Sequence, residues 1–141
     1  MKKVFAIVVT LCVFVLCSCE FRDPFEVAHT YSDNFVLSLD DGVEESRSYL
    51  HSDFWVGEER YSDFVLQLER AGEIDFSNGI EIISSENNLL GSISGIMENG
   101  SVYQYFYEVS VGEKVVKMFV VVVHNDIDYG VMYFGIYDPE L

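Results

Sequence analysis

The feature that most constrains the fold is a pair of alternating segments, residues 102–111 and 115–124, joined by a short connection. Alternation of apolar and other side chains with a period of two is typical of β-strands. A glycine in the first position of a two-residue loop, here Gly112, favours a type II′ hairpin. This turn places Val111 opposite Lys114. It therefore predicts the register of both strands, because a shift by one residue would move every side chain to the other face.

The predicted register gives the two faces of this hairpin different side chains. On one face, Glu108 lies opposite Lys117, and Phe106 lies opposite Phe119. Apolar residues thus meet apolar residues and the lysine meets a carboxylate, which are favourable cross-strand pairs. On the opposite face, every second residue of the first strand has an apolar partner on the second strand: Tyr103, Tyr105, Tyr107 and Val109 lie opposite Val122, Val120, Met118 and Val116.

Three shorter segments alternate in the same way and are predicted as further strands: residues 80–84, 90–97 and 131–137. We expect Val123 to pair with Val131 at the start of the last strand. The apolar residues that this pairing brings to the face of the tyrosines are Met132, Phe134 and Ile136.

The pair Asn99-Gly100 is the preferred sequence for a two-residue type I′ hairpin. This turn predicts that Ile96 and Ser94 lie beside Tyr103 and Tyr105, respectively. The sheet is then a meander of antiparallel strands, each joined to the next along the chain.

Three helices are predicted in the first half, where apolar residues recur at helical spacing. Gly42 and Gly57 interrupt the pattern after the first and second helices, and Gly72 suits the C′ position of the third. The residues of the helix faces are Val27, Tyr31, Phe35 and Leu39, then Val43, Ser46, Leu50 and Phe54, then Tyr61, Phe64, Val65 and Leu68.

These elements predict an α+β fold in which N-terminal helices pack on a curved antiparallel sheet of four to five strands. The helices must cover an apolar surface, and the tyrosine-bearing face of the sheet is the candidate. We find no internal repeat and no linker rich in Pro, Ser or Gly, and the length supports one domain. Residues 27–141 are therefore expected to form a single α+β domain.

The N-terminal segment has the pattern of an export signal. Lys2 and Lys3 are followed by an uncharged run, residues 4–16, that is too short to span a bilayer as a helix. The run ends in Leu16-Cys17-Ser18-Cys19, which resembles the lipobox of bacterial lipoproteins. This resemblance implies that residues 1–18 are a signal peptide that is removed, and that Cys19 receives lipid. The alternative is an ordinary secretory signal peptide.

Lipidation would make the membrane a partner, because two or three acyl chains anchor a protein stably. We expect residues 19–26 to form a short tether, and the protein to lie in the cell envelope on the periplasmic or surface side. Cys19 would be the only cysteine left after processing, so the mature chain would have no internal disulfide. The sequence does not distinguish the inner from the outer membrane.

The chain is strongly acidic, with a net charge of −16. Removal of residues 1–18 takes away Lys2 and Lys3 and no acidic residue, so the remaining 123 residues carry a charge of −18. Such a chain lacks the basic surface of a nucleic-acid-binding protein. An acidic protein would also be repelled by an anionic membrane surface.

The order of elements, together with three stretches of sequence, resembles a known family. These stretches are DNFVLSLDDGVEESRSYLHSDF, YSDFVLQLERAGEI and YQYFYEVSVGEKVVKMFVVVVHNDIDYGVMYFGIY. They look like the helices and closing hairpins of the small nuclear-transport-factor-2-like (cystatin-like) lipoproteins of bacteria. The resemblance implies a sheet that curls around the helices as a cone, and a pocket inside it. It implies no particular chemistry.

We find no motif for a catalytic or metal site. The three histidines, His29, His51 and His124, lie far apart in the sequence and lack the spacings typical of zinc ligands. Residues 125–130 resemble a calcium loop in part, but Tyr129 stands where an oxygen ligand is required. The acidic residues near Asp41 are explained by a helix N-terminus. We therefore predict no catalytic residue, no metal site and no cofactor.

The tyrosines are the candidate ligand site. Small Ser94 and Ser92 would lie across from large Tyr105 and Tyr107, respectively, an arrangement that can leave a cavity lined by hydroxyl groups. Ligand pockets are typically apolar with a few polar groups. The alternative is structural, since tyrosine is a good strand former. The predicted pocket thus comprises Tyr103, Tyr105, Tyr107, Ser92 and Ser94.

Three functions remain open. The first is a non-catalytic binding or interaction module whose partner is an unknown protein or small molecule. The second is a small hydrolase or isomerase of the same cone fold. An enzyme would need an acid–base pair inside the cone, which the predicted core face does not offer, so we favour the first. The third is an acidic inhibitor or immunity-like protein that masks a basic partner. The oligomeric state is not predicted.

Overall fold

A computed structural model describes residues 22–91 and 100–138. The expected signal peptide and Cys19, as well as Ser92 and Ser94, lie outside these residues. Within the described parts of the chain, no helix is long and apolar enough to cross a membrane. The fold can therefore be compared with the sequence predictions only from Arg22 onward.

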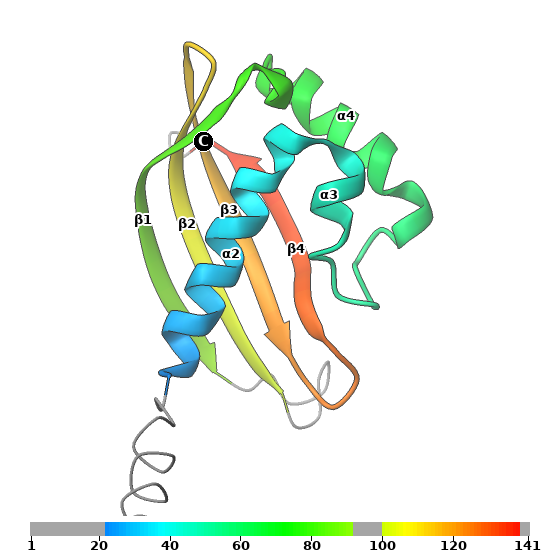
Figure 1. The fold of residues 1–141 in the computed structure, drawn as a ribbon, viewed down its shortest axis with the longest axis vertical. Coiled ribbons are helices and arrows are strands. Elements are labelled where there is room, and N and C mark those ends of the chain that lie inside the picture. The colour runs from blue at the N-terminus through cyan, green and yellow to red at the C-terminus, as the bar shows by residue number, and fades with distance from the viewer. Residues whose placement is uncertain (1–21, 92–99, 139–141) are drawn as a thin grey trace, which may run out of the picture.

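The fold is α+β, as the sequence predicts. Helices α2, α3 and α4 precede an antiparallel sheet with the strand order β1-β2-β3-β4. Figure 1 shows α2 lying across the sheet, and α3 and α4 beside its β4 edge. The elements are α2 (Pro24–Asp41), α3 (Val43–Arg47), the 3-10 turn η1 (Glu58–Arg60), α4 (Tyr61–Gly72), the 3-10 turn η2 (Phe76–Asn78), β1 (Ile80–Gly91), β2 (Ser101–Val111), β3 (Lys114–His124) and β4 (Tyr129–Tyr137).

The hairpin of β2 and β3 has the predicted register throughout. Val111 lies opposite Lys114, Phe106 opposite Phe119, and Tyr103 opposite Val122. Gly112 has a φ of 59°, the positive value that the first position of a type II′ turn requires. The turn and the alternation thus define this hairpin together.

The pairing of β1 differs from the prediction. The structure has one long strand, and it places Leu89 opposite Tyr103 and Asn87 opposite Tyr105, in place of Ile96 and Ser94. The predicted pairing of Ile96 and Ser94 with these tyrosines is therefore wrong, and Asn99 of the expected turn lies outside the described residues. The register of β1 follows from its other end, where the Gly112 amide donates to the Gly79 carbonyl 3.0 Å away.

The last strand has the predicted register at one end only. Phe134 lies opposite Val120 as expected, but Val131 lies opposite Val122, not Val123, because a bulge at Met132 shifts the pairing. The cause is a second partner for this strand. The His51 amide donates to the Val131 carbonyl at 2.9 Å, so residues near His51 run along the outer edge of β4. Val131, and not Met132, is buried.

Gly130 permits this close approach of two chain segments. A Cβ at this position would lie 2.5 Å from the His51 amide nitrogen. A side chain here would push the segment around His51 away from β4. The glycine is required by contact, not by its backbone angles.

Helix α2 is longer than predicted and presents a different face. Asp23 caps it by accepting from the Phe25 amide at 3.0 Å, so residues 24–26 of the expected tether are helical. Phe35 and Leu39 are buried as predicted, but Val27 is 39% exposed. The reason is geometric, because a spacing of four residues drifts around a helix that has 3.6 residues per turn.

The other helices also differ in detail from the prediction. α3 ends at Arg47, before Leu50 and Phe54, which were expected on this helix. Both residues are buried, but they lie in the segment that follows the helix. The left-handed residue after α4 is Glu73 (φ 51°), not Gly72, which is the last residue of the helix. Gly72 instead lies against Ile136, since a Cβ there would be 3.0 Å from the side chain of Ile136.

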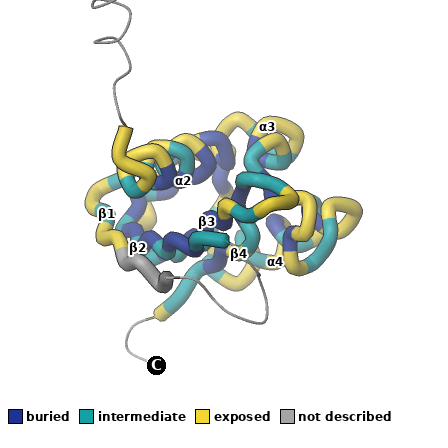
Figure 2. Tube along the Cα trace, turned by 90° about the horizontal axis from the view of Figure 1, so that it is seen from below, coloured by how far each residue is buried: buried dark blue, intermediate teal, exposed yellow. Residues whose placement is uncertain are grey.

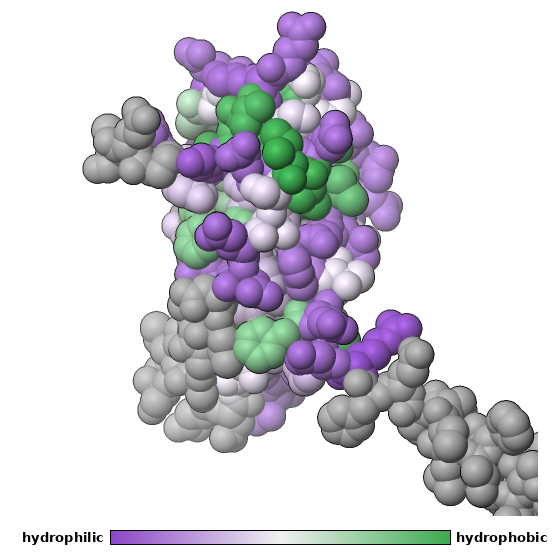
Figure 3. Space-filling view, turned by 90° about the vertical axis from the view of Figure 1, so that its left-hand side faces the viewer, coloured by the Kyte–Doolittle hydropathy of each residue, from purple (hydrophilic) through white to green (hydrophobic). Residues whose placement is uncertain are grey.

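The core fills the space between the sheet and the helices, as Figure 2 shows by the buried segments that face one another. Phe134 lies at its centre, with its ring 4.8 Å from that of Phe35 and 5.1 Å from that of Phe64. The edge strand β1 is more exposed. Figure 3 shows that its side of the molecule is mostly hydrophilic around one apolar patch. Ile83, in the β1 bulge, is 51% exposed.

Candidate functional site

The three predicted tyrosines share one face and are buried under α2, an arrangement that we call the tyrosine face (Tyr103, Tyr105 and Tyr107). The Tyr105 hydroxyl donates to the Phe25 carbonyl at 3.1 Å. Tyr107 donates to Asp33 Oδ1 at 2.8 Å, and its hydroxyl oxygen lies 2.7 Å from Ser32 Oγ. The hydroxyls expected to surround a ligand therefore bind groups of helix α2.

Burial raises the pKa of both Tyr105 and Tyr107 far above that of an exposed tyrosine. Both phenols consequently remain protonated at neutral pH and act as hydrogen-bond donors.

The cross-strand partners of the tyrosines also differ from the prediction. On β1, Asn87 lies opposite Tyr105 and Ser85 opposite Tyr107, in place of Ser94 and Ser92.

One polar cluster at this face involves residues that the sequence analysis did not bring together. The His29 ring stacks on Tyr105 with a centroid distance of 4.9 Å. His29 Nε2 lies 2.9 Å from Ser85 Oγ and 3.4 Å from Asp33 Oδ1. A sequence signal existed for one part of this cluster, because His29 and Asp33 are four residues apart on a helix. Nothing in the sequence indicated Ser85.

The geometry of this cluster does not match a catalytic triad. In a triad, the carboxylate orients the imidazole through one nitrogen while the other nitrogen faces the nucleophile. Here Ser85 and Asp33 both contact the same nitrogen of His29. The cluster joins α2 to strands β1 and β2, so its evident role is to position the helix on the sheet.

His51 has both ring nitrogens bound to other groups, away from the tyrosines. The Asp53 amide donates to its Nδ1 at 3.0 Å, and Nε2 lies 3.0 Å from Asn125 Oδ1. Because Nδ1 accepts, the proton lies on Nε2 and is donated to Asn125. The ring is 1% exposed. His51 thus ties the segment after α3 to the loop between β3 and β4.

The loop with a partial resemblance to a calcium site is held by hydrogen bonds within the protein. Asn125 Oδ1 accepts from the amides of Ile127 and Asp128. The amides of Tyr129 and Ser52 donate to Asp128, and these bonds, that of Tyr129 above all, lower the pKa of its carboxyl. Over the described residues, no group of three or more His, Cys, Asp or Glu is placed to hold a metal ion.

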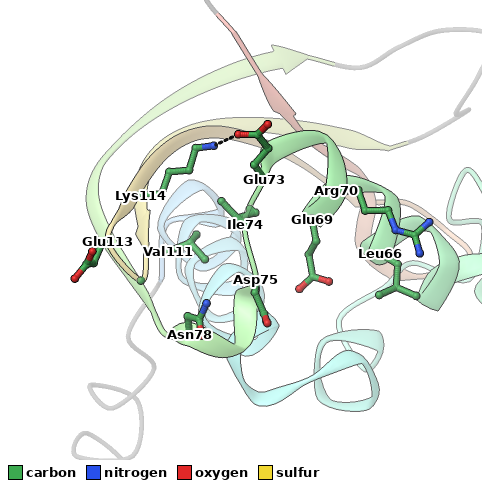
Figure 4. Close-up of a pocket in the computed structure, with 11 residues that line it drawn as sticks. Leu66, Glu69, Arg70, Glu73, Ile74, Asp75, Asn78, Val111, Glu113 and Lys114 are labelled. Atoms are coloured by element: carbon green, nitrogen blue, oxygen red, sulfur yellow. Dashed lines mark hydrogen bonds and ion pairs between the residues drawn. The ribbon is translucent and has the colours of Figure 1, made fainter.

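An open groove of about 910 Å³ lies at the other end of the sheet, and we call it the α4 groove. Figure 4 shows its apolar residues Ile74 and Val111 side by side, with Leu66 at the far end. The residues that line it come from the end of α4, the η2 turn and the β2–β3 hairpin: Leu66, Glu69, Arg70, Glu73, Ile74, Asp75, Asn78, Val111, Gly112, Glu113 and Lys114.

Several charged groups of the α4 groove also hold its walls. Lys114 Nζ donates to the Gly72 carbonyl at 2.7 Å and lies 3.5 Å from Glu73, where a cation offsets the negative end of helix α4. Glu69 Oε1 accepts from the Phe76 amide at 2.9 Å. Hydrogen bonds from the hydroxyl and amide of Ser77 lower the pKa of Asp75, so this carboxylate is charged at neutral pH.

A second hollow of about 360 Å³ lies on the other side of the contact between Lys114 and Gly72. It is bounded by Val116, Lys117, Ile136 and Tyr137. No motif in the sequence indicated either hollow, because each is formed by segments that are distant in the chain.

No protein-family model, curated protein or solved structure matches this chain.

Proposed function

We propose that this protein is a lipid-anchored protein of the bacterial cell envelope that acts as a non-catalytic binding or interaction module. The observation that carries the binding role is the α4 groove, which combines an apolar floor with charged groups at its rim. Ligand sites are typically concave and apolar, with a few polar groups that orient the ligand. The anchoring role rests on the sequence around Cys19.

The roles of the histidines support a non-catalytic function over a small hydrolase or isomerase. His51 uses both ring nitrogens for structural hydrogen bonds, and His29 contacts Ser85 and Asp33 through one nitrogen. A general base needs a free nitrogen within reach of a substrate proton. His51 has no such free nitrogen, and the contacts of His29 with Ser85 and Asp33 do not form a catalytic triad.

We further propose that the fold belongs with the cone-shaped, cystatin-like lipoproteins. The order of elements supports this, since helices come first and a four-stranded antiparallel meander follows. The position of α2 across the sheet also supports it, because the helix covers the tyrosine face. In this protein α2 occupies the place where the family resemblance implies a pocket.

The anchor is tested by labelling cells that express the full chain with radioactive palmitate. Cys19→Ala should abolish labelling, because the thiol that receives lipid is lost. Cys12→Ala and Cys17→Ala are matched controls, since each removes a cysteine of the same segment, and both should remain labelled. Unchanged labelling of the Cys19 variant would overturn the anchoring proposal.

The binding role is tested by native mass spectrometry of the full chain purified in mild detergent. We expect a bound molecule or protein that is retained by the wild-type chain and lost from Leu66→Asp. Leu66 is 48% exposed in the α4 groove, so this variant should fold normally. Retention of the same bound species by the variant would place binding elsewhere and contradict the proposal.

A further inference from the structure

Part of the lining of the α4 groove is apolar surface that the described chain leaves exposed. Val111 is buried, Ile74 is half-buried and Leu66 is 48% exposed. A single exposed leucine is ordinary in a soluble protein. Here, however, Leu66 belongs to a groove of about 910 Å³ with two further apolar residues. The groove can therefore receive an apolar side chain of a ligand.

The charged groups at the rim differ in how far contacts inside the protein already occupy them. Lys114 contacts the end of α4 and Glu73, and these contacts offset part of its positive charge. Glu69 and Asp75 use Oε1 and Oδ1, respectively, for amides of the η2 turn. In the described contacts their second oxygens are unused, and they remain open to a cationic ligand.

The remaining charges leave the groove acidic. Glu113 is exposed at the hairpin tip on one side, and Figure 4 shows the Arg70 guanidinium on the opposite side, beside Leu66. The carboxylates of Glu69 and Asp75 thus line the groove and that of Glu113 lies at its edge, whereas Arg70 is the only cation among the described lining residues without a contact inside the protein. An anionic ligand would meet net repulsion here.

The charge of the whole molecule acts in the same direction. The segment from Cys19 onward carries a net charge of −18. A field of this sign accelerates the approach of cations and opposes the approach of anions or of a second copy of the chain. The open shape of the groove suits an extended peptide more than an enclosed small molecule.

From this geometry and charge, we propose that the α4 groove binds a basic peptide segment of a partner protein. An apolar side chain of the segment packs on Leu66 and Ile74, while its lysine or arginine residues pair with Glu69, Asp75 and Glu113. This inference rests on the proposed binding function and names the class of partner.

The test is a calorimetric titration of the full chain in mild detergent with three short peptides of equal length. The first contains lysine, leucine and serine, the second has glutamate in place of lysine, and the third has serine in place of leucine. We expect the first to bind, the second not to bind, and the third to bind about tenfold more weakly because the apolar contact is lost. Binding of the first should weaken as salt is added.

Two pairs of variants test whether the peptide binds in the α4 groove. Leu66→Asp and Glu113→Lys in the groove should each weaken binding of the lysine–leucine peptide about tenfold or more. Leu37→Asp on α2 and Glu86→Lys on β1 make the same chemical changes at exposed positions outside the groove. These two controls should bind the peptide within about twofold of the wild type.

Three results would overturn the inference. One is equal weakening by groove and control variants, which would indicate attraction to the acidic surface in general. Another is equal binding of the glutamate peptide. The third is a failure of every peptide while native mass spectrometry finds a small molecule that Leu66→Asp releases. In that case the proposed binding function stands and the peptide partner is wrong.

Discussion

The two ends of the inner sheet surface differ in how their polar groups are used. At the tyrosine face, the hydroxyls of Tyr105 and Tyr107 meet acceptors on α2, and His29 stacks on the first of them. At the α4 groove, the side chain of Leu66 remains exposed beside carboxylates that retain unused oxygens.

This difference indicates which region stabilises the fold and which is available to a partner. Buried polar groups with complete hydrogen bonds specify one packing arrangement and leave nothing to bind a ligand. Exposed apolar surface in a hollow favours binding. Substitutions at the tyrosine face should therefore lower stability, whereas those in the α4 groove should lower binding.

The largest effect is expected in the aromatic core. Phe134→Ala removes a ring that is 1% exposed and contacts Phe35, Phe54 and Phe64. We expect the free energy of unfolding to fall by about 3–5 kcal/mol, as measured by urea denaturation. Leu66→Ala in the α4 groove is the control, with a change of about 0.5 kcal/mol or less. Equal losses would remove the distinction between the regions.

High pH should lower the free energy of unfolding, because the protein contains buried tyrosines. Burial raises the pKa of Tyr61 to about 12, above the value of about 10 for an unfolded chain. A raised pKa means that the folded state favours the neutral phenol, so this stabilisation is complete below about pH 10 and is lost as the pH rises toward 12.

The measurement is urea denaturation over this alkaline range, with tyrosinate formation followed by ultraviolet absorbance. We expect the free energy of unfolding to fall as the pH rises, and Tyr61→Phe to lose less over the same range. Constant stability of the wild type between pH 10 and 12 would contradict the role assigned to burial.

A smaller effect is expected for one hydroxyl of the tyrosine face. Tyr107→Phe removes the hydroxyl that contacts Asp33 and Ser32 and should lower the free energy of unfolding by about 1–2 kcal/mol. Tyr133→Phe removes a hydroxyl from a side chain that is 37% exposed, and it should change stability by about 0.5 kcal/mol or less. Thermal and urea denaturation of both variants would check this difference.

The smallest effect concerns the wall of the α4 groove. Lys114→Met removes the cation that binds the last carbonyl of α4, at Gly72. We expect a loss of about 0.3–1 kcal/mol, reduced at high salt because this lysine is exposed. Lys117→Met, three residues further along the same strand, is the control. A salt-independent loss would show that packing, not charge, links Lys114 to the helix.

Parts of the fold that depend on local signals could be predicted from the sequence. The β2–β3 register follows from alternation and from Gly112, and the structure has it at every pair. The register of β1 and the bulge at Met132 could not be predicted, because distant groups determine them. Gly79 aligns β1 through Gly112, and the segment at His51 shifts β4.

The candidate sites show the same limit. The tyrosines were found because three of them alternate on a strand, but their burial depends on α2, which the strand pattern does not describe. The α4 groove joins Leu66, Ile74 and Val111, which no spacing rule connects. Only the packing of α4 against the hairpin brings them together.

The most direct test of the account is to map, by NMR of the isotopically labelled full chain in micelles, the amides perturbed by the lysine–leucine peptide. We predict perturbed amides at Leu66, Ile74 and Glu113, with those of Ser32 and Tyr105 unchanged. The account is contradicted if the amides of the tyrosine face move while those of the α4 groove do not.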